Sequence, residues 1–136
     1  MEPNHKPLRF LFSWGPVILF AAVIFWFSSR TEVPELPGTT DKFVHFAEYF
    51  LFALLLWRAL AGELFWRFDL RRSLAVFLTA SVYAFSDEVH QSFVPGRNAS
   101  FYDWLADVAG ILGMITLVLS GVKWRGRDVN HHYEKI

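Results

Sequence analysis

Residues 74–97 read LAVFLTASVYAFSDEVHQSFVPGR. An apolar run of twelve residues, Leu74–Phe85, leads directly into two acids, a histidine and a glutamine, and Pro95-Gly96 then interrupts the pattern. A membrane-spanning helix needs roughly 20 mostly apolar residues, so the apolar run alone is too short. Continued to Phe93, the helix would be about 30 Å long at 1.5 Å per residue. We therefore expect the polar residues in the last turns of a membrane helix, where they are costly without partners or water.

The composition of the whole chain points to a membrane. Hydrophobic residues make up 54% of the sequence, which holds 15 Phe and 6 Trp, and the mean hydropathy is +0.29. Four spans would take about 80 residues and leave only short connections. A soluble helical protein is disfavoured because the first and fourth apolar segments have no interior polar stripe to face water. The apolar segments are Phe10–Phe27, Phe43–Leu60, Leu74–Phe85 and Trp104–Val122.

The prediction is an all-α polytopic membrane protein with four transmembrane helices. Residues 10–122 would form one membrane domain, with residues 1–9 before it and a tail, residues 123–136, after it. Lys6 and Arg9 precede the first apolar segment as they would in a signal peptide. However, that segment runs about eighteen residues, beyond the usual apolar region of about 7–15, so we expect it to be retained as a span.

Charge and cysteine usage exclude several classes of function. The chain has no cysteine, which excludes disulfides, thiolate catalysis and cysteine-based metal sites. A formal net charge of zero gives no indication of a nucleic-acid partner.

Basic residues are distributed as a topology signal. Ten of the 13 Lys and Arg residues lie before the first span, between the second and third, or after the fourth. The positive-inside rule then places both termini in the cytoplasm of a multi-pass cell-membrane protein. The loops Thr31–Asp41 and Val94–Phe101 would face outward.

With both termini in the cytoplasm, polar residues from three spans lie at the same depth of the membrane. Asp41, His45 and Glu48 are spaced i, i+4 and i+7, which is one face of a helix. The third span carries its polar residues at its outer end, and the fourth span begins there. We predict one outward-facing polar site built from Asp41, Lys42, His45, Glu48, Asp87, Glu88, His90, Gln91, Arg97, Asp103 and Asp107.

Simpler roles compete with a shared site for some of these residues. Asp41 fits equally well as a residue that favours the start of the second span. Ser100 precedes an apolar helix in a capping-box pattern and is expected to cap it. His45 could bond to a neighbouring helix as a packing histidine. Glu48 sits deeper in the membrane and needs Arg97, Lys42 or a proton as its partner.

The remaining polar and small residues also have expected roles. Asp87 and Glu88 are adjacent, so only one is expected in the site and the other near the headgroups. Arg97 would either pair with an acid and hold its loop down, or present its planar guanidinium group to an anionic headgroup. We favour the first role. Gly110 and Gly113 are expected to allow close helix packing rather than to contact a ligand.

A cluster of carboxylates and imidazoles can bind a divalent metal or perform acid–base chemistry. His45, Asp87 and His90 are the candidate metal ligands. The sequence requires no cofactor, and it contains neither H-E-x-x-H nor G-x-S-x-G, so no catalytic residue is assigned. The start of the fourth span, beside Arg97 and Ser100, would suit a phosphate group.

Three segments together resemble the VanZ-like family of small bacterial integral membrane proteins, over about residues 10–122. They are Asp41-Lys42-x-x-His45-Phe46-x-x-Tyr49, Asp87-Glu88-x-His90-Gln91-x-Phe93-x-Pro95-Gly96-Arg97 and Asp103-x-x-Ala106-x-x-x-Gly110. The resemblance implies a bacterial inner-membrane protein of the cell envelope with a link to glycopeptide (teicoplanin) resistance and no assigned activity. The family pattern usually has Asn where this chain has Asp107, an acid that adds a charge or shares a proton.

Three functions stay open at this point. The protein could bind or alter membrane lipids or a lipid-linked cell-wall precursor of the outer leaflet. It could be an intramembrane enzyme that acts on a lipid-linked envelope intermediate. It could also be a small proton-coupled carrier that uses Glu48 and Asp107, in which case four helices would require a homo-oligomer.

Overall fold

The computed structural model describes residues 6–31, 38–62, 65, 67 and 69–133, with side chains from residue 8 to residue 121. Within these residues the chain forms four α-helices and no strand, as predicted. The helices are α1 (Lys6–Ser28), α2 (Gly38–Ala61), α3 (Leu70–Gln91) and α4 (Phe101–Tyr133).

Helix α3 is shifted toward the N-terminus relative to the expected span of residues 74–93. It starts at Leu70 because the side chain of Asp69 accepts a hydrogen bond of 2.9 Å from the backbone N–H of Arg71, which caps the helix. It ends at Gln91, two residues before Phe93.

Three of the helices are long and apolar enough to cross a membrane. The qualifying segments are Leu8–Ser28, Thr39–Ala61 and Phe101–Gly121. Helix α3 has the length, with 22 residues, but Arg71 and Arg72 at its start and Asp87 and Glu88 near its end lower its apolar content. Three of the four predicted spans, α1, α2 and α4, are therefore confirmed as helices that are long and apolar enough to cross a membrane.

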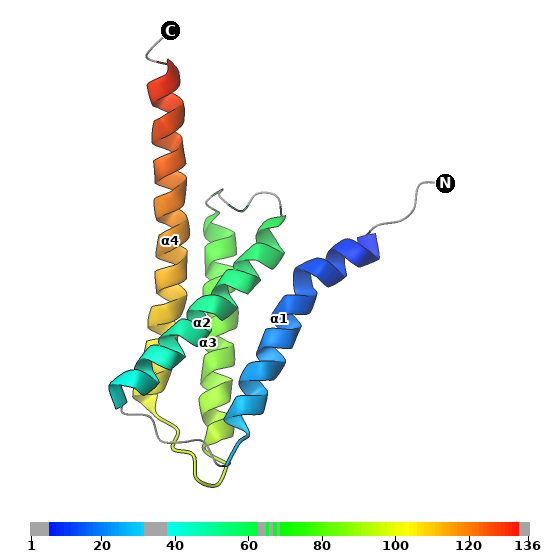
Figure 1. The fold of residues 1–136 in the computed structure, drawn as a ribbon, viewed down its shortest axis with the longest axis vertical. Helices are drawn as coiled ribbons and strands as arrows, with labels where there is room; N and C mark the ends of the chain where they lie inside the picture. The colour runs from blue at the N-terminus through cyan, green and yellow to red at the C-terminus, as the bar shows by residue number, and fades with distance from the viewer. Residues whose placement is uncertain (1–5, 32–37, 63–64, 66, 68, 134–136) are drawn as a thin grey trace.

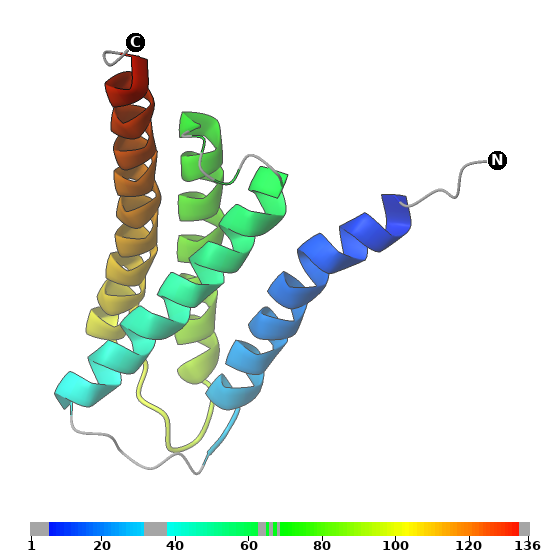
Figure 2. The ribbon, with the colours of Figure 1, turned by 45° about the horizontal axis from the view of Figure 1, so that its top comes forward.

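The chain direction brings four helix ends together. The C-terminal ends of α1 and α3 lie at the same end of the bundle as the N-terminal ends of α2 and α4 (Figures 1 and 2). The N-terminal end of α1 and the C-terminal end of α4 lie at the opposite end. The polar stretches that the sequence places at these four ends are therefore neighbours in space, and we call this end the polar end.

Helices α2 and α4 make the most extensive contact in the bundle. Their contact depends on Gly110, because a Cβ atom placed there would lie 2.2 Å from the backbone oxygen of Phe46. A Cβ atom placed at Gly113, one turn later, would lie 3.3 Å from the end of the Phe46 ring. The expectation that both glycines serve close packing is confirmed. The large side chains of the core, Tyr49 and Trp57 among them, are completely buried beyond this contact.

Candidate functional site

A buried pair links α2 to α4 at the polar end. His45 Nδ1 and Asp107 Oδ1 are 3.0 Å apart, and the two side chains are 10% and 2% exposed. The expected bond from His45 to a neighbouring helix is thus present. Its partner on α4 is Asp107.

A second contact between the same helices lies nearer the end of the bundle. The ammonium group of Lys42 donates to Asp103 and, at 3.3 Å, to Asp41. Asp103 is buried, whereas Asp41 and Lys42 are half-buried. Lys42 therefore neutralises the acids at the start of α2 and α4 and is not the partner of Glu48.

Glu88 connects α3 to the beginning of α4. Its Oε2 atom accepts a hydrogen bond of 2.8 Å from the backbone N–H of Ser100. The Ser100 hydroxyl accepts from the N–H of Tyr102 at 3.2 Å, which confirms the predicted capping role of Ser100. Carboxylate oxygens of Glu88 and Asp107 and a ring nitrogen of His45 all lie within 4.8 Å of one another.

A chain of hydrogen bonds on the other side of α3 holds the loop that follows it. Ser28 Oγ donates to Asp87 Oδ1 at 2.6 Å, and Gln91 Nε2 donates to Asp87 Oδ2 at 2.9 Å. Arg97 Nη2 donates to Gln91 Oε1 at 2.9 Å. Arg97 thus holds its loop down, as we favoured, but it reaches the acid through Gln91 rather than directly.

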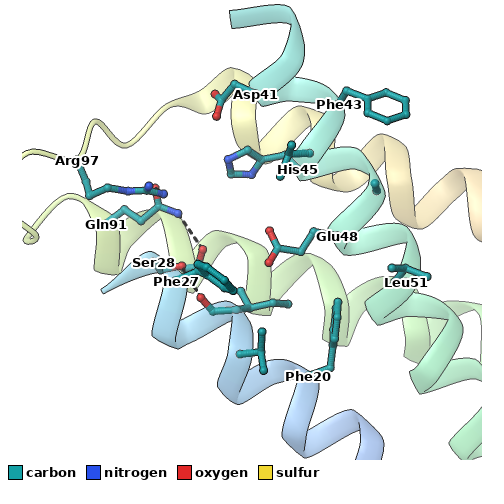
Figure 3. Close-up of a pocket in the computed structure, with 15 residues that line it drawn as sticks. Phe20, Phe27, Ser28, Asp41, Phe43, His45, Glu48, Leu51, Gln91 and Arg97 are labelled. Atoms are coloured by element: carbon teal, nitrogen blue, oxygen red, sulfur yellow. Dashed lines mark hydrogen bonds between the residues drawn. The ribbon is translucent and has the colours of Figure 1, made fainter. Parts of the chain in front are cut away.

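The loop itself turns at Pro95-Gly96. The N–H of Arg97 donates to the oxygen of Val94 at 3.1 Å, and Gly96 has a φ of 82°. Pro followed by a residue with positive φ is typical of a type II turn, which favours glycine at that position. The turn directs Arg97 back over the helix ends (Figure 3).

Two expectations about α3 need correction. Asp87 and Glu88 are both buried, at 7% and 6% exposure, so neither faces the headgroup region. The reason is that α3 packs against all three other helices, and Asp87 bonds to Ser28 of α1 while Glu88 bonds to the start of α4. His90, in contrast, lies away from His45: its Nε2 is 3.0 Å from Ser29 Oγ, and its ring packs on Phe25. The structure therefore does not bring His45, Asp87 and His90 together as a metal site.

A cavity of about 500 Å³ lies between α1 and α2 at the polar end. The Glu48 carboxylate points into it, as Figure 3 shows, and makes no hydrogen bond or ion pair within the described residues. The apolar wall is open to the outside of the bundle, since Phe43 is 70% and Phe27 54% exposed. The cavity is lined by Phe20, Val23, Ile24, Phe27, Ser28, Asp41, Phe43, Val44, His45, Ala47, Glu48, Leu51, Asp87, Gln91 and Arg97.

The contribution of α1 was not predicted from the sequence. Ser28 and Ser29 each reach α3, and Phe20 and Phe27 form part of the cavity wall. The available signal was the pair of serines at the end of the first apolar segment, at the same level as the other polar groups.

The fold and the site together define a multi-pass helical membrane protein with charged side chains buried at one end. The family model described as VanZ/LLP1 matches residues 4–122. The chain therefore belongs to the VanZ/LLP1 family, as its three motifs indicated. No curated protein and no solved structure matches the chain.

Proposed function

We propose that this protein binds an amphiphile of the outer membrane leaflet in the cavity between α1 and α2. The observation that carries the proposal is the division of the cavity wall: charged and amide groups line one end, and exposed aromatic and aliphatic side chains line the rest. An amphiphile would place its headgroup at the polar end and its hydrocarbon chain beside Phe20, Phe43 and Leu51.

The charges in the cavity favour a headgroup that offers both an anion and hydrogen-bond donors. A guanidinium carries five N–H donors, and Arg97 uses its Nη2 to contact Gln91, so other donors remain for a phosphate. Glu48 would accept from hydroxyl or amine groups. Phospholipids and lipid-linked cell-wall precursors both meet this description. Binding of such a precursor would provide the link to glycopeptide resistance that the family resemblance implies.

The orientation in the membrane is part of the proposal. Leu74, Leu78, Val82, Phe85 and Val89 form an exposed apolar stripe along α3. The stripe is about 23 Å long at 1.5 Å per residue, which supports a fourth span. Arg58, Arg67, Arg71 and Arg72 lie at or between the ends of α2 and α3 that are remote from the polar end (Figure 1). By the positive-inside rule, that end is cytoplasmic and the cavity faces outward, in the bacterial cell membrane.

Filling the cavity tests the proposal. Ala47 lines the cavity on α2, and Ala47→Trp would occupy part of its volume. We expect the purified wild-type protein to retain a membrane amphiphile in native mass spectrometry. Retention should fall at least about tenfold in Ala47→Trp, the equivalent of about 1.4 kcal/mol of binding free energy.

The matched control is Ala109→Trp, which adds the same side chain at an exposed position on α4. It should retain as much amphiphile as the wild type. Equal retention by Ala47→Trp and Ala109→Trp, with both folded, would contradict the proposed binding site.

A further inference from the structure

We propose that His45, Glu88 and Asp107 bind one divalent transition-metal cation. The three residues come from α2, α3 and α4, and each offers a ligand atom within 4.8 Å of the other two. They are 8%, 6% and 1% exposed. The proposed ion would therefore lie inside the bundle, where the three helices meet.

The charges of the three side chains favour a cation between them. Two carboxylates are buried beside one imidazole, which carries one positive charge at most. The ammonium group of Lys42 is already engaged by Asp41 and Asp103. Burial of a carboxylate without a compensating charge is costly. A divalent ion supplies the charge that these side chains lack.

One oxygen of Glu88 points to a missing partner. Its Oε2 atom accepts from the N–H of Ser100, but its Oε1 atom is buried and has no hydrogen-bond partner within the described residues. Buried polar atoms almost always have a partner. A metal bond at the carboxylate would satisfy it. The hydrogen bond from Ser100 would then orient the ligand, as outer hydrogen bonds do in metal sites.

The geometry and the donor set fit a small divalent ion. Ligand atoms about 2.1 Å from a tetrahedral ion lie about 3.4 Å from each other, so a pair of atoms slightly closer than this needs to separate only a little to bind one. His45 Nδ1 and Asp107 Oδ1 are 3.0 Å apart. One nitrogen and two carboxylate ligands favour Zn²⁺ or a similar ion over Ca²⁺ or Mg²⁺, which prefer oxygen ligands alone. Three protein ligands leave a coordination position open.

A neighbouring set, Asp41, His45 and Asp103, also offers three ligand atoms within 4.8 Å of one another. We assign the ion to the inner set because Lys42 already pairs with both acids of the outer one. Of the three metal ligands predicted from the sequence, His45 belongs to the proposed site. Glu88 and Asp107 take the places of Asp87 and His90.

The test is a Zn²⁺ titration of purified protein stripped with a chelator, in detergent. We expect one equivalent of Zn²⁺ to bind, with affinity at least about tenfold lower in Glu88→Gln and in Asp107→Asn. The matched control for His45→Gln is His90→Gln, which removes the histidine that contacts Ser29. His45→Gln should weaken Zn²⁺ binding, and His90→Gln should leave it unchanged.

X-ray absorption of the Zn²⁺-loaded wild type decides the case if a variant fails to fold. A first shell of oxygen with one imidazole supports the site, whereas a shell with two or more imidazoles, or with oxygen alone, overturns it. Failure of folded wild type to bind one equivalent, or unchanged affinity in folded Glu88→Gln, also overturns it. The amphiphile measurement uses no added metal, so either proposal can fail without the other.

Discussion

Gly110→Ala is expected to destabilise the bundle by about 3 kcal/mol or more, at the upper end of overpacking effects. The added Cβ would lie 2.2 Å from the backbone oxygen of Phe46 and 3.0 Å from the backbone nitrogen of Phe50. Both atoms belong to the helix backbone, so α2 and α4 would have to separate rather than repack a side chain. The melting temperature of the purified protein, followed by tryptophan fluorescence, measures the loss.

Gly113→Ala is the matched control for this prediction. Its added Cβ would meet the end of the Phe46 ring at 3.3 Å, and that ring can shift by a few tenths of an ångström. Its effect should therefore be small. Similar melting temperatures for the Gly110→Ala and Gly113→Ala proteins would show that close approach of α2 and α4 is not what holds the polar end together.

Asp107→Leu is expected to be the second large loss, about 3 kcal/mol. Leucine is branched like aspartate but is larger and apolar, so it leaves His45 Nδ1 without its partner at a site where the His45 side chain is 10% exposed. Removal of one member of a buried pair costs about 3–5 kcal/mol. Asp107→Asn should be much milder, because its amide oxygen still accepts from an Nδ1–H donor. Thermal unfolding at one fixed pH compares the two variants.

A double variant separates the pair from its surroundings. If the loss comes from an unpaired His45, then His45→Phe combined with Asp107→Leu should recover much of it, since apolar replacement of both partners is often neutral. An Asp107→Leu protein as stable as the wild type would contradict the assigned pair.

The sequence predicts well at which end of the bundle each polar residue lies. It predicts less well which neighbouring helix each polar side chain contacts. The apolar segments and the i, i+4, i+7 spacing of Asp41, His45 and Glu48 place these residues on one face at one end of the bundle. Positive φ at Gly96 and the cap at Ser100 follow from local chemistry that a few neighbouring residues determine. Such features need no knowledge of the other helices.

The partners of residues on α3 could not be predicted in the same way. Glu88 and His90 lie two positions apart and so point to opposite faces of α3, and in the structure Glu88 turns toward α4 and His90 toward α1. Which face of α3 meets which neighbour depends on how the helix is rotated in the bundle. That rotation is set by packing of small and large side chains across interfaces, which the pattern within a single helix does not encode. The role of Ser28 was missed for the same reason.

Cysteine labelling tests most directly the central claim that the polar end faces outward. The chain has no cysteine, so single substitutions report without background. Asn98→Cys lies in the exposed loop at the polar end, and Leu70→Cys lies at the start of α3, with every Lys and Arg retained. A membrane-impermeant maleimide should label Asn98→Cys in intact cells and Leu70→Cys only after permeabilisation. Labelling of Leu70→Cys but not of Asn98→Cys in intact cells would contradict the outward orientation of the polar end.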